Sequence, residues 1–469
     1  MNTSSIPSPA SSTGLAKGSK IKLEDGEEAV RYILEAARAA GATSADALYL
    51  SGVDETVGVR KGEIEKVHAA QSRGIGIRVF AGQRQSSVAT SDFGADHLKS
   101  LVERAVAMAQ HTAEDPYAGL PDRILPPAID PVRLFPEEDH IPSRDELIER
   151  AKAAEAAALG FDPRITNSEG AECARSRTHV VFGNSLGFLH GYRKSSYTLS
   201  CSVIATSKDQ MERDYWYVSG PLWESTENSE EIGLKAASRT VSRLGARRIK
   251  TGTYPVIFDP ETARSLIGHF AGAVSGSALY RNATYLKGRE GTPVMNPCMT
   301  LREDPFLRGA PGSRPFDGEG LPTRKKTLVD AGVLQTFLFD TYSARKLGRQ
   351  STANAVRSLG DGPGVGISNL IVEPGTLSQE ALLKKAGTGL LVTELIGFGV
   401  STVTGDYSRG AFGYWFEDGV ILHPVSEITL AGTLDEIYKN IVDRGSDLEI
   451  RSSINSPSLL VEGLRIAGE

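Results

Sequence analysis

The feature that most constrains the fold is a run of strand-like segments between residues 47 and 89, joined by very short turns. The segments ALYLSG, ETVGVR, EIEKVHAA, GIGIRVF and QSSVAT follow one another, and turn pairs such as Lys61-Gly62 and Ala81-Gly82 separate them. Connections this short join antiparallel neighbours, because a parallel neighbour needs a crossover of a dozen or more residues. The first half of the chain is therefore predicted to contain an antiparallel sheet.

Helical periodicity appears on both sides of this run. Ser143 and Glu146 have the spacing of a capping box and predict a helix start just after Pro142. A further helix is expected after Asp259-Pro260, in a segment unusually rich in Gly, Ala and Ser. The predicted helices cover about residues 27–40, 95–110, 143–159, 229–244, 261–279 and 434–442.

Changes in composition divide the chain into three regions. Residues 1–20 are rich in Ser and Pro without apolar anchors, which predicts a disordered tail. Residues 21–245 are predicted to form an N-terminal α/β region with an antiparallel-rich sheet, and the proline-rich stretch 112–142 leaves a subdivision open there. Residues 246–469 are predicted to form a β-rich C-terminal domain, a mostly antiparallel sheet or barrel. The predicted fold class is α+β.

Net charge, cysteine spacing and hydropathy together predict the cellular compartment of the protein. The formal net charge of −6 gives no electrostatic case for binding nucleic acid or an anionic membrane. Cys173, Cys201 and Cys298 are far apart, which fits a reducing compartment better than a disulfide framework. No run approaches the roughly 18 apolar residues of a membrane span, and the N-terminus has no signal-peptide core. We therefore expect a cytoplasmic protein without direct membrane or nucleic-acid binding.

The histidines argue against a zinc centre on a helix of this chain. In hydrolases such a centre needs two imidazoles on one helix face, at i and i+4, or at i+5 if the helix bulges. The closest pair, His179 and His190, is too far apart, and no histidine is followed by glutamate. His269 lies on a predicted helix, where a lone histidine is more readily a packed or partner-facing residue than a ligand. We therefore predict no catalytic residue and no metal ligand in this chain.

Residues 403–419 contain the densest constellation of candidate binding residues. Asp406, Tyr407 and Arg409 lie between glycines and precede a run of aromatic residues, a combination typical of recognition surfaces. A structural Asp–Arg pair that fixes a strand connection explains the same residues equally well. Weaker candidates of the same kind are Tyr280, Arg281 and Arg314.

Long motifs follow one another in order along the second half of the chain. They are TGTYPVIFDPETA, GHFAGAVSGSALYRNATYLKG, REDPFLRGAPGSRPFDGEG with the following segment to DTYSARKLG, GTGLLVTELIGFGVSTVTGDYSRGAFGYWFEDG, and HPVSEITLAGTL. Together with VRKGEIEKVHAAQSRGIGIRVF in the first half, they resemble the PmbA/TldE branch of the TldD/PmbA family, peptidase U62-like proteins labelled modulators of DNA gyrase. The resemblance implies an α/β N-terminal region followed by a β-rich C-terminal domain.

The resemblance also implies a division of labour between two related subunits. The TldD-type sister carries an H-E-x-x-x-H helix that holds zinc, and the same register on this chain places Ile267, Gly268 and Gly272 at the His, Glu and His positions. None of these can be a ligand or a general base, so no cofactor is expected here and zinc is expected in the sister. The implied partners are that sister, in a heterodimer or larger assembly, and an unfolded polypeptide, and a homodimer of the isolated chain is compatible with this. We also expect the small residues of this helix, Gly272 among them, to let another backbone approach closely.

Three functional hypotheses remain open at this point. The first is the accessory subunit of a cytoplasmic TldD–TldE metallopeptidase that degrades or processes unfolded peptides. The second is a non-enzymatic binding or regulatory protein that acts on gyrase or on a toxin–antitoxin complex. The third is an autonomous hydrolase with a carboxylate-rich metal site, which the missing histidine pair disfavours without excluding Asp and Glu ligands.

Overall fold

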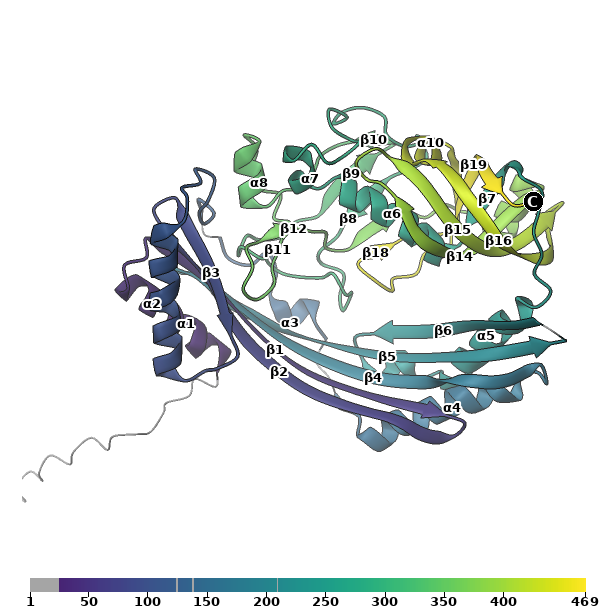
Figure 1. Ribbon diagram of the computed structural model, residues 1–469, viewed down its shortest axis with the longest axis horizontal. Coiled ribbons are helices and arrows are strands. Elements are labelled where there is room, and N and C mark those ends of the chain that lie inside the picture. Colours follow the sequence, from purple (N-terminus) through teal and green to yellow (C-terminus); the bar gives the residue numbers. More distant parts are fainter. Residues whose placement is uncertain (1–24, 124, 137–138, 209) are drawn as a thin grey trace, which may run out of the picture.

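The computed structural model describes residues 25–469 except 124, 137–138 and 209. The tail predicted over residues 1–20 lies outside the described residues. Within the described part, a long curved sheet faces a separate β-rich domain, and the chain passes from one to the other after helix α5 (Figure 1). In the same residues, no helix is both long enough and apolar enough to cross a membrane.

Six antiparallel strands form the N-terminal sheet in the order β3-β2-β1-β4-β5-β6, which confirms the predicted antiparallel sheet. The short segments expected over residues 47–89 merge into longer strands, two of which contain 17 and 19 residues. They merge because residues such as Gly52 and Ser72, which pair with each other, continue the extended chain instead of forming turns. The strands are β1 Ser44–Arg60, β2 Glu63–Ala81, β3 Arg84–Thr90, β4 Ile165–Asn184, β5 Leu189–Ser207 and β6 Gln210–Gly220.

Helices cover the convex face of this sheet with apolar side chains. Tyr49 and Val57 point to this face of β1 and enter the cores under the two pairs of helices. The predicted capping box is present: Glu146 Oε2 accepts from the Ser143 backbone N at 2.7 Å, and Ser143 Oγ accepts from the Glu146 backbone N at 3.3 Å. The helices are α1 Gly26–Ala39, α2 Ala95–His111, α4 Arg144–Gly160 and α5 Ser229–Ser242, with the short α3 Pro131–Leu134 and a 3-10 turn at Trp223–Thr226.

The concave face of the sheet carries small hydroxyl side chains in its middle, while at one end of the same face Leu48 and Phe182 pack with Phe316 of the C-terminal domain. On β5, Ser196 and Thr198 alternate with Tyr197 and Leu199, which are buried under the helices. The same face continues with Ser176 and Thr178 on β4 and Ser219 on β6. An antiparallel sheet can face water on one side when that side is polar, so this face does not need a packed domain against it.

The C-terminal domain contains a closed barrel of five strands, which confirms the β-rich, barrel-like domain predicted from the sequence. The order is β16-β15-β14-β7-β19, and pairing between β16 and β19 closes the ring. The strands are β7 Gly252–Phe258, β14 Gly389–Val400, β15 Asp406–Glu417, β16 Val420–Thr433 and β19 Leu459–Ala467, with β17 Ile441–Arg444 added to β19.

Smaller sheets and short helices complete this domain. One sheet has the order β10-β9-β8-β13-β18, and β11 pairs with β12. These strands are β8 Leu301–Glu303, β9 Lys326–Asp330, β10 Val333–Leu334, β11 Ala355–Val356, β12 Gly364–Val365, β13 Leu370–Val372 and β18 Ile454–Asn455. The helices are α6 Pro260–Ala273, α7 Gly276–Tyr280, α8 Thr341–Lys346, α9 Gln379–Ala386 and α10 Leu434–Lys439.

The prediction of a single helix over residues 261–279 is wrong, because the structure has two helices there, α6 and α7. At the break the backbone N of Gly276 donates to Leu338 O at 2.7 Å, which ties the chain to the segment before α8. A Cβ at Gly276 would lie 2.8 Å from that oxygen and 2.4 Å from the Phe339 ring. The expected close backbone approach therefore occurs at Gly276. Gly272 is exposed, and a Cβ there would meet only Thr402 Cγ2 at 4.0 Å. The prediction of close packing at Gly272 is therefore also wrong.

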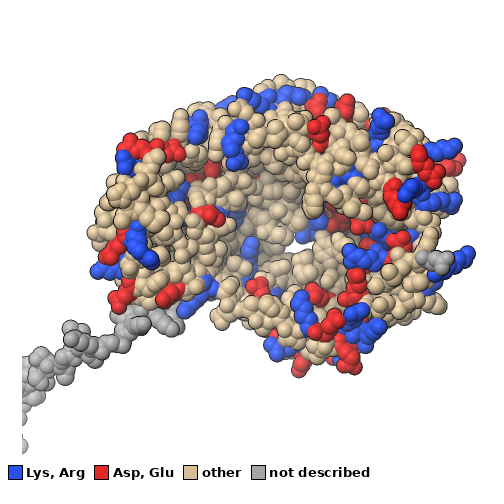
Figure 2. Space-filling model, in the orientation of Figure 1, with Lys and Arg blue, Asp and Glu red and all other residues tan. Residues whose placement is uncertain are grey.

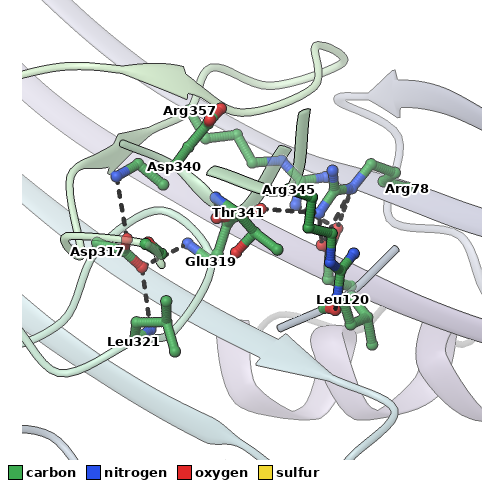
Figure 3. A network of polar contacts seen from close by, with 12 residues as sticks. Arg78, Leu120, Asp317, Glu319, Leu321, Asp340, Thr341, Arg345 and Arg357 are labelled. Carbon is green, nitrogen blue, oxygen red and sulfur yellow. Dashed lines mark hydrogen bonds and ion pairs between the residues drawn. The ribbon is translucent and has the colours of Figure 1, made fainter. Parts of the chain in front are cut away.

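A buried network of charged side chains joins the two parts at one end of the sheet (Figure 3). Asp46 on β1 is fully buried. Arg78 on β2 donates from Nη2 to Asp46 Oδ2 at 2.5 Å, and Arg357, which follows β11, donates from Nη1 to Asp46 Oδ1. Burial opposes ionisation of Asp46, but Arg357 and Arg78 outweigh it and lower the pKa of this carboxyl. The N-terminal sheet therefore holds a buried anion that depends on a cation from the C-terminal domain.

The C-terminal side of this network contains two further carboxyl groups. Glu319 Oε1 lies 3.8 Å from Arg78 Nη2, and Oε2 accepts from the Thr341 backbone N at 2.8 Å. Burial, followed by the charge of Asp317, raises the pKa of Glu319 to about 7. Asp317 in turn accepts backbone hydrogen bonds from residues 319, 321 and 355. These bonds fix the loop that carries both carboxyl groups against the sheet.

A second set of contacts joins the two parts at the other end of the sheet. Arg243, just after α5, donates from Nη2 to Glu394 Oε2 on β14 at 2.7 Å, and its guanidinium lies 3.8 Å from the centroid of the Phe412 ring. The hydroxyls of Ser242 and Tyr414 are 2.5 Å apart. The C-terminal domain is therefore attached at both ends of the curved sheet, and the polar concave face lies between the attachments.

We predict that Arg357→Met destabilises the protein by about 3–5 kcal/mol, because it leaves the buried Asp46 carboxylate with one cation fewer. Urea unfolding measures the change. Arg349→Met is the matched control, since Arg349 is half-exposed and pairs with Glu290 at the surface at 2.7 Å, where a pair contributes about 1 kcal/mol or less. Adding Asp46→Asn to Arg357→Met should recover part of the loss. Equal effects of Arg357→Met and Arg349→Met would contradict the role of the network.

Candidate functional site

A groove separates the N-terminal sheet from the C-terminal domain, and Figure 2 shows the molecule hollowed between them. Two cavities of about 650 Å³ each lie along it. The first is beside the edge strand β6, helix α5 and the N-terminal ends of α6 and α9, and the second lies over β4 and β5. The segment 449–451 borders both, with Arg451 in the first and Ile450 in the second. Cavities of this size are typical of ligand sites.

Helix α6 forms the C-terminal wall of the first part of the groove. Asp259 caps it, accepting from the Thr262 backbone N at 2.8 Å, and Pro260 at the first helical position needs no hydrogen-bond partner for its nitrogen. The helix buries one side in the barrel core, through Ala263, Leu266, Ile267, Phe270 and Ala273. The opposite side, which spans an arc of about 100° at 100° per residue, carries Glu261, Arg264, Ser265, Gly268 and Gly272.

The edge strand β6 forms the facing wall with aromatic residues and cations. The guanidinium groups of Arg451 and Arg239 lie 4.4 Å and 5.1 Å from the Trp216 ring centroid. Arg264 on α6 donates to Tyr217 Oη at 3.2 Å, and it also pairs with Glu261 at 2.6 Å. An aromatic ring between guanidinium groups offers flat apolar area together with charge. The groove can therefore hold a mixed polar and apolar chain such as a peptide.

The residues at the predicted metal-motif positions do not share one face of α6. Ile267 is fully buried in the barrel core, whereas Gly268 and Gly272 lie on the opposite side of the helix, the side on which Arg264 and Ser265 line the groove. His269, one position along, has its ring centroid 6.2 Å from that of Tyr407, and its Nε2 has no hydrogen-bond partner in the part of the chain that the structure describes. Burial, with a contribution from Arg409, lowers the pKa of His269. One imidazole beside two glycines supplies too few donors, so this helix does not fit a zinc ion.

Metal-binding clusters are also absent elsewhere in the part of the chain that the structure describes. Among those residues, no group of three or more His, Cys, Asp or Glu side chains is placed to hold a metal ion. The three cysteines are free, and burial raises the pKa of Cys173 and of Cys201 to about 12, which leaves both as thiols at neutral pH.

The predicted binding residues of β15 divide between the groove and the surface. Arg409 lines the groove opposite Glu261 and donates to the carbonyl oxygens of Leu395 and Ile396 at 3.2 Å and 3.3 Å. Tyr407 is buried against His269. Asp406 is exposed and accepts from Thr404 Oγ1 at 2.5 Å. Of the three, Arg409 alone is therefore a groove residue in the described chain.

The remaining predicted residues lie in two other places. The Tyr280 ring centroid is 5.9 Å from that of Tyr342 on α8, and Arg281 donates from Nε to Ser277 O at 3.0 Å. Arg314 lies near Tyr192 and Lys194, and its Nε has no hydrogen-bond partner among the described residues. The structure does not unite the predicted residues in one site.

Sequence reasoning missed the residues that form most of the groove. Trp216, Tyr217 and Arg264 were not singled out, although the segment DYWYV carries three aromatic residues in a row in the middle of β6. Consecutive residues of a strand point to opposite faces, so three aromatic residues in a row place aromatic side chains on both faces. This pattern could have indicated that both sides of β6 are covered. The partners of β6 come from α5, α6 and the segment near residue 451, so their meeting could not be read from local spacing.

A curved antiparallel sheet facing a five-stranded barrel defines the class of this protein, and three regions of the chain match the domains of one family in order. Residues 45–109 match PmbA/TldA metallopeptidase domain 1, residues 138–244 match its central domain, and residues 251–468 match its C-terminal domain. The chain belongs to the PmbA/TldD metallopeptidase family.

Individual relatives agree with this assignment. Metalloprotease PmbA of Escherichia coli O157:H7 is 40% identical over 447 residues, which cover 94% of this chain and 96% of that protein. A PmbA homologue from Haemophilus influenzae is 39% identical over 460 residues, covering 97% and 98%. A Bacteroides thetaiotaomicron structure described as a modulator of DNA gyrase has a TM-score of 0.83 at 26% identity, over 95% of this chain and 100% of that one. TldE from Thermococcus kodakarensis has a TM-score of 0.84 at 21% identity over 94% and 100%, which shows the shared fold.

We predict that Asp259→Asn changes the pH dependence of stability. Burial raises the pKa of Asp259 from 3.8 to about 6 although Thr262 donates to it. The folded state therefore binds a proton more tightly than the unfolded state, and wild-type stability falls as pH rises through that interval, by on the order of 2–3 kcal/mol. Asparagine keeps the capping oxygen but does not ionise, so the variant should gain stability relative to wild type between pH 4 and pH 7.5.

Urea unfolding of both proteins at the two pH values measures this difference. Asp162→Asn is the control, because the partly exposed Asp162 carboxylate pairs with Arg164 and its pKa is lowered, not raised. A stability difference between wild type and Asp259→Asn that is the same at both pH values would contradict the assignment.

Proposed function

We propose that this chain is the TldE/PmbA-type subunit of a cytoplasmic two-subunit metallopeptidase of the TldD–TldE kind. It holds an extended, unfolded peptide in the groove between its sheet and its C-terminal domain. The zinc-bearing sister, with its H-E-x-x-x-H helix, supplies the ion that polarises the scissile carbonyl and activates water. This chain contributes binding and positioning, with no metal and no general base of its own.

The observation that carries this proposal is the face that α6 turns to the groove. Its residues Ser265, Gly268 and Gly272 are small, so the helix leaves room for a ligand backbone at the place where a zinc helix would carry bulky donors. A Cβ at Gly268 would meet only Ile454 Cδ1 at 3.6 Å. Space at the two glycines, without the imidazoles of a zinc helix, suits a surface that receives a peptide.

The edge strand β6 supports the same proposal from the other wall. It pairs with β5 on one side, and it is the last strand in the order of its sheet. Its residues 214–217 face α6 and β14 across the groove. An extended peptide added to such an edge binds through its backbone, which would accept many sequences.

The alternative is a non-enzymatic regulatory protein that acts on gyrase or a toxin–antitoxin complex. It draws support from the solved structures described as modulators of DNA gyrase. Under this alternative the groove would bind a folded partner, and loss of the groove would not affect peptide cleavage.

The deciding experiment co-expresses this chain with its TldD-like sister and measures zinc content and cleavage of an unfolded peptide, in the pair and in each chain alone. The pair should cleave the peptide, with zinc bound through the sister, and this chain alone should do neither. Full cleavage by the sister alone would overturn the proposal. Zinc and cleavage in this chain alone would favour an autonomous hydrolase.

A groove-filling variant links the activity to the site. Gly268→Trp in the assembled pair should reduce cleavage at least about tenfold by occupying the peptide's space, with zinc content unchanged. Gly160→Trp is the matched control, since Gly160 ends α4 on the helix-covered side and a Cβ there meets nothing within 4 Å. Unchanged cleavage by the Gly268→Trp pair would contradict a peptide in this groove.

A further inference from the structure

The second cavity of the groove holds Lys194, which has no counter-ion among the residues that the structure describes. Lys194 points from β5 toward the C-terminal domain, on the same strand face as Tyr192 and Ser196 and opposite Thr178 of β4. Within the described residues it makes no hydrogen bond and no ion pair. Burial, with a smaller effect of nearby Arg314, lowers the pKa of Lys194. The ammonium group is therefore less stable here than in water, and an added anion would stabilise it.

Stacked aromatic rings and a hydrogen-bonded loop form the walls of this cavity. Phe135 stacks on Tyr192 with ring centroids 5.0 Å apart and planes at 14°. The loop 307–311 closes the C-terminal side, and Gly309 fixes it by donating from its backbone N to Leu134 O at 2.9 Å. A Cβ at Gly309 would lie 2.5 Å from Pro221, so the loop sits directly on the end of β6. The cavity of about 650 Å³ is thus a preformed space.

Among the described residues, the charged side chains that line this cavity are all basic. Its charged lining residues are Lys194 and Arg308, and no acidic side chain from the described residues lines it. Arg308 is exposed and has no ion pair in the described chain. The hydroxyls of Ser176 and Thr178 line the cavity beside Lys194, and neither makes a hydrogen bond within those residues. Cations and free hydroxyls together offer several donors to one small anion.

We propose that this cavity is a subsite for a carboxylate group of the peptide bound in the groove, with Lys194 as its main partner and Arg308 at its entrance. The inference rests on the proposed peptide-holding function, because peptides carry their negative charge as carboxylates. The group is either the C-terminal α-carboxylate or an Asp or Glu side chain. The segment 449–451 runs from this cavity to the one beside α6, so one extended peptide can reach both.

Fluorescence anisotropy with the full chain, alone and in the assembled pair, tests this subsite. Three labelled peptides of one uncharged sequence are compared: one with a free C-terminus, one amidated, and one amidated with a glutamate near its end. At low salt at least one carboxylate peptide should bind wild type about tenfold tighter than the neutral amide. Lys194→Met should remove this difference. The peptide that gains affinity identifies the source of the carboxylate.

Lys152→Met is the matched control, because it removes the same charge from α4 on the helix-covered side of the sheet, and it should keep the full preference. Equal affinities of all three peptides for wild type would overturn the subsite and leave the proposed groove intact. The same loss in Lys194→Met and Lys152→Met would overturn it as well. Absence of all peptide binding, alone and in the pair, would overturn the subsite together with the proposed function.

A measurement on the wild-type protein covers the case in which Lys194→Met does not fold. Brief acetylation with acetic anhydride, quantified by mass spectrometry, reports the accessibility and protonation of each lysine. The carboxylate peptide should reduce acetylation of Lys194 at least about fivefold relative to Lys152. Equal labelling of Lys194 with and without the peptide would overturn the subsite.

Discussion

The groove depends on the buried contact of Asp46 with Arg78 and Arg357. A carboxylate with no exposed surface is costly unless cations surround it, and here one of the two cations comes from the other domain. The sheet and the barrel domain are therefore held in one arrangement at this end, while Arg243 and Glu394 hold them at the other. Attachment at both ends allows the middle of the interface to stay open without the domains separating.

The chemistry of the open middle follows from the alternation of residues along the strands. Between Tyr197 and Ala205 every second residue of β5 is buried under helices, and residues between them, such as Thr198 and Ser200, are small and polar. This face can stay wet or receive a ligand without exposing a large apolar area. Helix α6 adds a face of small residues, and β6 adds an unpaired edge with aromatic side chains. The proposed peptide site is where these three surfaces meet.

Local patterns in the sequence predict the antiparallel sheet, the start of α4 at its capping box and the β-rich second half, because each depends on residues close in the chain. They fail where long-range contacts decide. The break between α6 and α7 depends on Gly276 meeting the chain at Leu338, and the junction pairs Asp46 with Arg357, 311 residues away. Arg409 was found from its glycine-flanked aromatic motif, but Lys194 has no local signal, since its missing counter-ion is a property of the assembled cavity.

The central claim is that an extended peptide lies between β6 and α6 in the assembled protein, and site-specific photo-crosslinking tests it most directly. Benzoylphenylalanine placed at Ser265, on the groove face of α6, should crosslink to an unfolded peptide, and the same group at Gly160 on the helix-covered side should not. Mass spectrometry of the crosslinked product identifies the peptide atoms. Strong crosslinks from Ser265 alone would support the account, and equal yields at the two positions, or none at Ser265 under conditions where the pair cleaves the peptide, would contradict it.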